Sequence, residues 1–202
     1  SSSVAIYNTE ICTLPLTESD FMKGDLNSSE SLYGNVKRLA FHVLTNFKIH
    51  TDTKFVYGII TNLFGASEAL DLSSKHVIEA LLQKAKHASS NLNHPEIRIW
   101  GSPNSSRDFL SYEMAAKIIL DLIDHDAGVI NIASGQETTI LEILQLIEEI
   151  QRIKFLYYYE SGPEAVTRRY CSIEKLQIFK PNILSYNSRF DIKTYLTTQL
   201  HF

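Results

Sequence analysis

The chain has 202 residues, 44% hydrophobic and 21% charged, with a formal net charge of −4 at pH 7, a composition typical of a globular protein of one domain or one and a half. The acidic balance argues against nucleic acid as the main partner, and the lack of a long apolar run or signal peptide argues against a membrane partner. Cys12 and Cys171 are far apart and no histidine stands at metal-ligand spacing, so we expect free thiols, a cytoplasmic location and no metal site.

The first fifty residues predict a strand end, a long loop and a helix. Ser1 to Tyr7 is typical of the end of a buried strand, and because no turn precedes it we expect the natural protein to continue before Ser1. Residues 8–30 are rich in polar and turn-forming residues and predict a surface loop. A helix is expected over residues 31–49, with an inward stripe of Tyr33, Val36, Ala40, Val43, Leu44 and Phe47 and an outward face that includes Leu39, Phe41 and His42.

The rest of the chain alternates strands and helices. Strands are expected over residues 54–60, 97–100, 129–133 and 155–159, and a turn with an extended segment over 101–110. A helix is expected over residues 73–88, capped by Ser73 or Ser74, and another over 112–124, with Ala115, Ile118, Ile119 and Leu122 inward. A third helix should begin after the capping box of Thr139 and Glu142, and a fourth is expected over 172–179. The last twenty residues are weakly patterned. This alternation predicts an α/β fold with parallel strand pairing.

Tyr33 and Lys37 stand four residues apart on the first expected helix, so a phenol and an ammonium share one face. A nearby cation favours the phenolate, which would suit Tyr33 to acid/base chemistry at neutral pH. The spacing alone is weak evidence, because an amphipathic helix with a surface lysine produces it too. None of the eight glycines forms the Gly-x-Gly-x-x-Gly turn that cradles a dinucleotide pyrophosphate.

Taken in order, these segments resemble the extended short-chain dehydrogenase/reductase superfamily, the NAD-dependent epimerase/dehydratase family. Ser3 matches its catalytic serine at a strand end, and Tyr33 and Lys37 match its Tyr-x-x-x-Lys pair at a normal distance downstream. The resemblance implies the C-terminal part of a Rossmann-like parallel sheet domain, without its Gly-rich half, plus a smaller α/β substrate-binding domain. Residues 1–65 and 107–135 would form the first unit, and residues 66–106 and 136–202 the second.

Within this superfamily the chain is most similar to the GDP-L-fucose synthase group, whose members are GDP-4-keto-6-deoxymannose 3,5-epimerase/4-reductases. The similarity is carried by residues 61–65 (Thr-Asn-Leu-Phe-Gly), by 74–82 around His76, and by 97–102 followed by 107–110 (Arg-Asp-Phe-Leu). One departure is Ile60, which stands where the group has a proline. The resemblance runs from Ser1 to about Leu144 and is weaker afterwards.

The resemblance implies a catalytic role for four side chains. Tyr33 would protonate the C4 carbonyl oxygen as hydride arrives from NADPH, Lys37 would bind the nicotinamide ribose, and Ser3 would orient the same oxygen. Hydride addition builds negative charge on that oxygen, which two placed donors would stabilise. His76 would be the acid/base of sugar epimerisation, a task that suits imidazole. Ala5 stands where the group pairs this histidine with a cysteine, and an alanine cannot transfer a proton.

The resemblance further implies NADP as cofactor, with NAD as the alternative, and a nucleotide-diphosphate sugar as substrate. Cofactor contacts would come from Ser2, Ser3, Tyr33, Lys37, Ile60, Thr61, Asn62, Leu63 and His76. Substrate contacts would come from Lys84, Trp100, Arg107 and Arg169, since guanidinium forks suit a diphosphate and an indole offers a stacking face. A homodimer through the helix of Tyr33 and Lys37 is also expected.

Three functions follow from these residues. The first is an NADP-dependent oxidoreductase/epimerase that reduces a GDP-4-keto-6-deoxy sugar at C4. The second, suggested by Ala5, is C4 reduction alone on another nucleotide sugar. The third, suggested by the missing Gly-rich turn, is a truncated relative that does not catalyse and serves as a binding or assembly module.

Overall fold

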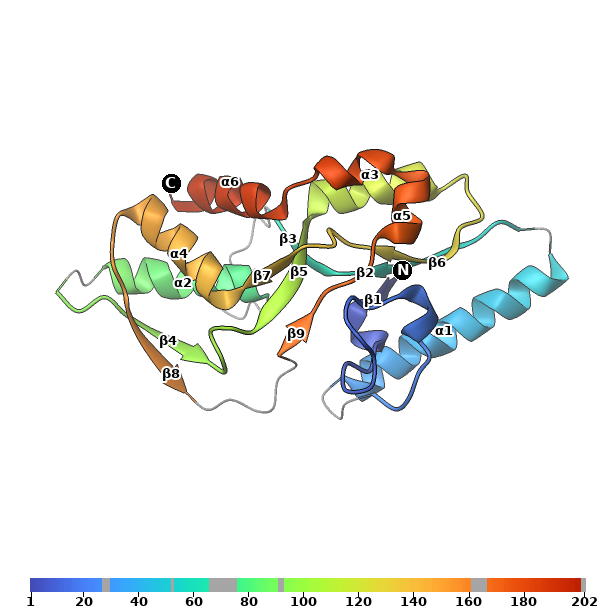
Figure 1. Ribbon diagram of the computed structural model, residues 1–202, viewed down its shortest axis with the longest axis horizontal. Coiled ribbons are helices and arrows are strands. Elements are labelled where there is room, and N and C mark those ends of the chain that lie inside the picture. Colours follow the sequence, from blue (N-terminus) through green and yellow to red (C-terminus); the bar gives the residue numbers. More distant parts are fainter. Residues whose placement is uncertain (27–29, 52, 66–75, 91–92, 161–166, 201–202) are drawn as a thin grey trace.

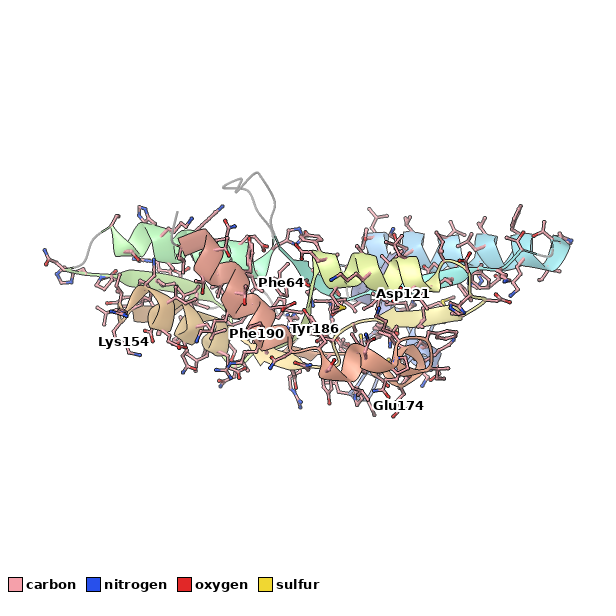
Figure 2. The ribbon with its side chains drawn as sticks, turned by 90° about the horizontal axis from the view of Figure 1, so that it is seen from above. Phe64, Asp121, Lys154, Glu174, Tyr186 and Phe190 are labelled. Atoms are coloured by element: carbon pink, nitrogen blue, oxygen red, sulfur yellow. The ribbon has the colours of Figure 1, made fainter. Side chains whose placement is uncertain are left out.

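The structure is a computed structural model that describes residues 1–26, 30–51, 53–65, 76–90, 93–160 and 167–200. It is an α/β molecule, elongated in Figure 1, with β4, β8, α2 and α4 towards one end and α1 reaching out at the other. Seen from above in Figure 2, Lys154 lies towards the first end and Asp121 and Glu174 towards the second, with Tyr186 between them. None of the helices in these ranges is long and apolar enough to cross a membrane.

A parallel three-stranded sheet lies beside α1. Its order is β1 (Ser2–Ser3), β2 (Val56–Ile60) and β6 (Gly128–Ile132). The α3 helix (Tyr112–Leu122), α5 (Glu174–Phe179) and the 3₁₀ helix η3 (Pro181–Ser185) cover it through a core made of Ala115, Ile118, Leu122, Ile130, Ile132, Leu176 and Ile183. Because the apolar runs of β2 and β6 are buried, they behave as strands covered by helices.

The middle of the molecule is held by short strands around β5. The β5 strand (Ser106–Ser111) pairs in parallel with β3 (Asn62–Phe64) and β9 (Arg168–Arg169), and antiparallel with β7 (Glu137–Thr139). Ser111 then caps α3, since its hydroxyl accepts a hydrogen bond from the amide of Met114. Sequence patterning predicted β5 as an extended segment but did not predict β3, β7 or β9.

At the end of the molecule away from α1, helices lie on a two-stranded parallel sheet of β4 (Glu96–Trp100) and β8 (Leu156–Glu160). Helices α2 (Val77–Ser89), α4 (Ile140–Gln151) and α6 (Ser188–Leu200) share one core with β4. The predicted capping box at α4 is confirmed, with Thr139 and Glu142 each accepting from the other's backbone amide. The α6 helix falls in the weakly patterned last twenty residues and was not predicted.

The α1 helix (Ser31–His50) spans the predicted range, but the predicted inward stripe was wrong. Tyr33, Val36, Val43 and Phe47 are each more than half exposed. The buried residues of α1 are Gly34 and Arg38, and Phe41, predicted to point outward, packs against Phe21 and Tyr57. The reason is that Gly34 and Arg38 in the first turns of α1 approach the backbone of Ala5 and Ile6, while Phe41 supplies the apolar contact further along the helix.

Smaller differences concern the ends of elements. Residues Val4–Ile6, predicted as strand, form the 3₁₀ helix η1, and a second 3₁₀ helix, η2 (Glu18–Asp20), interrupts the predicted loop. Ile119, predicted to point inward, is 41% exposed. Ser73 and Ser74 lie outside the described residues. The division into two units stays a prediction. The α5 and η3 helices lie in the range predicted for the second unit, but they pack against α3 and β6, which lie in the range predicted for the first.

Candidate active site

Ser3 lies at the carboxyl end of β1, where parallel strands of an open sheet present their ligand-binding edge. It pairs in register with Ile60, the last residue of β2. The Ser3 hydroxyl caps η1 by accepting a hydrogen bond from the amide of Ala5 over 3.4 Å. The structure therefore brings Ser3 directly beside the start of the Ile60–Leu63 segment.

Tyr33 and Lys37 lie on the first turns of α1. The Lys37 Nζ atom is 5.5 Å from the centre of the Tyr33 ring and donates a hydrogen bond of 3.2 Å to the carbonyl oxygen of Ser1. Lys37 makes no ion pair with any described residue, and the Tyr33 side chain is 53% exposed. The pair therefore adjoins β1 and keeps donor groups available to a ligand.

Gly34 and Arg38 hold α1 against the turn that follows β1. A Cβ atom on Gly34 would stand 2.7 Å from the carbonyl oxygen of Ala5, so only glycine permits this approach. One turn later, the Arg38 guanidinium donates to the carbonyl oxygens of Ile6, Lys23 and Gly24. These contacts fix Tyr33 and Lys37 relative to Ser3.

Tyr57 connects β2 to the same helix. Its hydroxyl donates a hydrogen bond to the carbonyl oxygen of Lys37. Burial raises the pKa of Tyr57, the nearby Tyr33 phenol raises it further, and the Ser2 hydroxyl beside it lowers it. Ser2 Oγ is buried and has no hydrogen-bond partner among the described residues. Tyr57 thus stays a neutral donor that locks α1 to the sheet.

Asp108 ties the Thr61–Asn62 segment to the sheet beneath it. The Thr61 hydroxyl and the side-chain Nδ2 of Asn62 both donate to the backbone carbonyl oxygen of Asp108, over 2.9 and 3.0 Å. Its fully buried carboxylate accepts from the amides of Ser134, Gly135 and Cys171 and from the Ser134 hydroxyl. Burial raises the pKa of Asp108 to about 6, although these hydrogen bonds lower it.

The predicted epimerisation requires groups that transfer protons, and the candidates are His76 and the thiols of Cys12 and Cys171. His76 is the N-cap residue of α2 with an exposed side chain, and its acid/base role stays a prediction. Ala5, at the position of the group's cysteine, is buried in η1. Burial and the Asp20 carboxylate raise the pKa of the Cys12 thiol, and burial raises the pKa of Cys171 well above its usual value. Neither Cys12 nor Cys171 is therefore prone to ionise and so to supply the proton-transferring thiol that Ala5 lacks.

Lys84 of α2 and Trp100 of β4 lie together at the end of the molecule away from α1. The Lys84 Nζ atom donates to the carbonyl oxygen of Arg98 over 2.7 Å and lies 5.6 Å from the centre of the Trp100 ring. The Trp100 side chain is 72% exposed, and its indole N–H donates to Glu160 over 2.7 Å. A ligand would find here a cation and an exposed aromatic face.

Arg107 and Arg169 are direct neighbours on β5 and β9. Arg169 is buried and donates to both carboxylate oxygens of Glu30, over 3.0 and 2.7 Å. Arg107 donates to the carbonyl oxygen of Ser106 over 2.7 Å. Burial and, after it, the positive charge of Arg169 lower the pKa of Arg107 to about 10, against the opposing effect of Glu30. The Arg107 guanidinium therefore carries charge at neutral pH.

The residues that sequence reasoning missed are Glu30, Gly34, Arg38, Tyr57 and Asp108. Each acts through a contact between distant parts of the chain, and the only local signal was the position of Gly34 and Arg38 next to the Tyr33–Lys37 pair. No group of three or more His, Cys, Asp or Glu side chains in the described ranges could hold a metal ion.

The side chains around β1 fit one end of a dinucleotide. Lys37, which has no ion pair with a described residue, can bind ribose hydroxyls; it reaches the carbonyl oxygen of Ser1 at the start of β1, and Ser3 pairs with Ile60 at the end of that strand. The sequence holds no Gly-rich turn for the pyrophosphate. The chain therefore offers residues for the nicotinamide ribose end of the cofactor and no such turn for its pyrophosphate.

The sequence of the chain is similar to those of known proteins. The sequence model of the NAD dependent epimerase/dehydratase family matches residues 1–133. A probable GDP-L-fucose synthase of Oryza sativa is 25% identical over 166 residues, which are 81% of this chain and 50% of the relative. The GDP-L-fucose synthase of Escherichia coli is 25% identical over 186 residues, 86% of this chain and 57% of the relative. The chain thus spans about half the length of the curated relatives it matches.

Solved structures show the same fold. A GDP-L-fucose synthetase from Naegleria fowleri bound to NADP superposes with a TM-score of 0.82 at 21% identity, over 99% of this chain and 64% of that one. A GDP-mannoheptose C4 reductase from Campylobacter jejuni with NADP bound gives a TM-score of 0.78 at 18% identity, over 99% and 67%. At these identities the likeness concerns the fold.

Proposed function

The chain belongs to the NAD dependent epimerase/dehydratase family, and we propose that it carries the catalytic and substrate-binding side chains of an NADP-dependent reductase/epimerase acting on a GDP-4-keto-6-deoxy sugar. One observation carries this proposal. The ammonium of Lys37 lies beside both the Tyr33 ring and the carbonyl oxygen of Ser1, which brings Ser3 and the Tyr–Lys pair to one edge of the sheet. Relatives named for GDP sugars support the substrate class.

The chemistry follows from what each side chain can donate. NADPH, when bound, supplies the hydride. Tyr33 gives its proton to the C4 oxygen of the sugar, and Ser3 donates a hydrogen bond that places this oxygen. Lys37 binds the ribose hydroxyls and stabilises the phenolate that remains. His76 is the proposed acid/base for epimerisation, at the start of α2.

The substrate is proposed to lie along β5 and β4. Arg107 and Arg169 bind the diphosphate, because two adjacent guanidinium groups match its charge and oxygen geometry. Lys84 and Trp100 contact the rest of the nucleotide through charge and stacking. Ile60, Thr61, Asn62 and Leu63 line the nicotinamide side.

The test follows NADPH oxidation by this protein with GDP-4-keto-6-deoxymannose. Tyr33→Phe should lose most of the rate at unchanged folding. Tyr158→Phe is the matched control, because Tyr158 is also an exposed tyrosine and lies on β8, far from β1 in Figure 1. An unchanged rate in Tyr33→Phe would refute the mechanism.

A reductase without epimerisation is the second candidate, and Ala5 favours it. The buried methyl group of Ala5 cannot move a proton, and neither cysteine is prone to ionise. Such an enzyme would reduce C4 of a deoxy or heptose sugar that already has its final configuration. Solvent deuterium found at C3 and C5 of the product would exclude it.

A binding or assembly module is the third candidate. It is favoured by the lack of the Gly-rich turn, since that turn is what brings a pyrophosphate to a helix N-terminus in dinucleotide-binding domains. Under this reading the 202 residues bind NADPH weakly. A dissociation constant in the low micromolar range by calorimetry would contradict it.

A second copy of the chain is the proposed protein partner. The face of α1 opposite Gly34 and Arg38 carries exposed apolar side chains at helical spacing, namely Leu32, Val36, Leu39, Val43 and Phe47. Two such faces packed together would bury both apolar stripes. The Tyr33–Lys37 helix would then form the centre of a homodimer.

A further inference from the structure

The cluster of Glu30, Arg107 and Arg169 has unbalanced charges. The Glu30 carboxylate pairs with Arg169, and the adjacent Arg107 has only the carbonyl oxygen of Ser106 as a hydrogen-bond partner among the described residues. The next arginine on β9, Arg168, is matched separately, since it donates to both oxygens of Glu137. The cluster therefore keeps a net positive charge in a partly buried place, which favours an additional anion.

Arg169 also has a hydrogen-bond donor that nothing satisfies. Its side chain is only 7% exposed, and its Nε atom is buried without a partner among the described residues. A buried N–H group left unpaired costs free energy that a ligand oxygen would recover. A single carboxylate cannot serve Arg107 and all of Arg169 at once, whereas a diphosphate carries enough oxygens and charge for both.

Glu30 has an alternative position close by. It is the N-cap residue of α1, yet its side chain makes no capping hydrogen bond and reaches away to Arg169. Its backbone carbonyl already accepts from the amide of Gly34 over 2.8 Å. A carboxylate at a helix N-terminus is stabilised by the exposed amides of the first turn. Tyr33 is three residues further along this helix.

We propose that Glu30 is an internal occupant of the anion site formed by Arg107 and Arg169, and that the substrate's diphosphate displaces it. The released carboxylate then caps α1, so that filling the anion site stabilises the turn that carries Tyr33. This inference rests on the proposed function, which assigns the diphosphate to Arg107 and Arg169. Figure 1 shows β9 close to the start of α1, as the ion pair between Arg169 and Glu30 requires.

The test measures GDP binding to the full chain by calorimetry. Glu30→Gln removes the competing charge and should tighten GDP binding by about tenfold or more. Glu137→Gln is the matched control, because it removes a carboxylate paired to the neighbouring Arg168 and alters the local charge equally. It should leave GDP affinity within about threefold of the wild type, as expected when no competing group is displaced. Circular dichroism confirms that each variant is folded.

A second readout follows the helix. Hydrogen exchange of the first turn of α1 should slow when GDP binds to the wild type and should slow less in Glu30→Ala, which has no carboxylate to cap it. Arg169→Lys keeps a positive charge but loses the bidentate contact, and should weaken GDP binding.

The outcomes separate the two ideas. Equal or weaker GDP binding in Glu30→Gln, with Arg169→Lys weakened, overturns the inference and leaves the diphosphate site in place. Equal tightening in Glu137→Gln overturns it as well, because general electrostatics would then explain the gain. If Arg107→Gln and Arg169→Lys bind GDP as the wild type does, the proposed diphosphate site itself is wrong.

Discussion

The Arg38 side chain donates two hydrogen bonds to the carbonyl oxygen of Ile6, from Nε over 3.2 Å and from Nη2 over 2.8 Å. The same guanidinium reaches the carbonyl oxygens of Lys23 and Gly24. A buried cation whose hydrogen bonds go only to backbone oxygens is unusual, because most buried charges are paired with an opposite charge. Burial accordingly lowers the pKa of Arg38.

Removal of this guanidinium should destabilise the fold. Arg38→Met keeps the length of the side chain but leaves three carbonyl groups without a donor, which should cost about 3 kcal/mol of unfolding free energy. Urea denaturation followed by circular dichroism measures the loss. Lys117→Met, an exposed change on α3, is the control and should have little effect. A midpoint equal to that of the wild type would show that Arg38 does not hold the turn.

Gly34→Ala should destabilise the protein although alanine is the better helix former. In a free helix this change is worth up to about 1 kcal/mol in the stabilising direction. Here the new Cβ would stand 2.7 Å from the carbonyl oxygen of Ala5, a backbone atom that cannot move independently, so we expect a net loss of about 1–3 kcal/mol. Asn35→Ala, one residue away on an exposed position, is the control in the same urea experiment. A stabilised Gly34→Ala would contradict the close approach.

The contrast between α1 and the core helices explains how far the sequence could predict this fold. Helical periodicity located α1, α3 and α4 well, because apolar spacing and the Thr139 cap are local features. It chose the wrong face of α1. A glycine and an arginine look like surface positions in an apolar pattern, yet Gly34 and Arg38 are the buried ones, since each of them approaches a backbone carbonyl oxygen, that of Ala5 or that of Ile6.

The site could be predicted only where its residues carry a local motif. Ser3, Tyr33 and Lys37 were predicted from spacing and resemblance, and their roles stay a prediction; the structure places Lys37 beside Tyr33 and Ser1. Glu30 could not be found in this way, because its partner Arg169 is 139 positions away in the sequence. The two-residue strand β9 likewise exists through its pairing with β5, which no local pattern encodes.

Asp108 should make stability depend on pH between about 4 and 6. Because burial raises the pKa of the folded-state carboxyl to about 6, above the ordinary value of 3.8, the folded protein holds this proton more tightly than the unfolded chain does. The resulting stabilisation is complete below pH 4 and is lost as the pH rises through 6, by about 3 kcal/mol in total.

Asp108→Asn isolates this contribution. The variant should be less stable at every pH, because its amide presents N–H groups to the donors of Ser134, Gly135 and Cys171. Its deficit relative to the wild type should shrink between pH 4 and pH 6, as measured by urea denaturation at each pH. A deficit that grows over this range would mean that the hydrogen bonds outweigh burial.

The exposed stripe of α1 should control the oligomeric state. Val43→Asp places a charge in the middle of the apolar face opposite Gly34 and should convert a homodimer to a monomer, because an unpaired carboxylate is costly in an apolar interface. Light scattering coupled to size-exclusion chromatography gives the mass directly. Asn35→Asp adds the same charge outside the stripe and should leave the dimer intact. A wild type that is monomeric at high concentration would exclude α1 as a dimer interface.

Under the second candidate function, a reductase without epimerisation, Ala5→Cys should introduce a proton exchange at the sugar that the wild type lacks. Ala5 is buried in η1 two residues after Ser3, and Ala5→Cys adds a thiol at the position where the resemblance implies a cysteine. The reaction is run in deuterated water, and mass spectrometry measures deuterium in the released sugar. Product made by Ala5→Cys should carry deuterium at C3 and C5, and product made by the wild type should carry none. Ala5→Ser, of similar size but with a hydroxyl that hardly ionises, separates proton transfer from a change in packing and should resemble the wild type. Deuterium at both carbons in the wild type would mean that another group, with His76, already performs the epimerisation, and that Ala5 does not limit this protein to reduction.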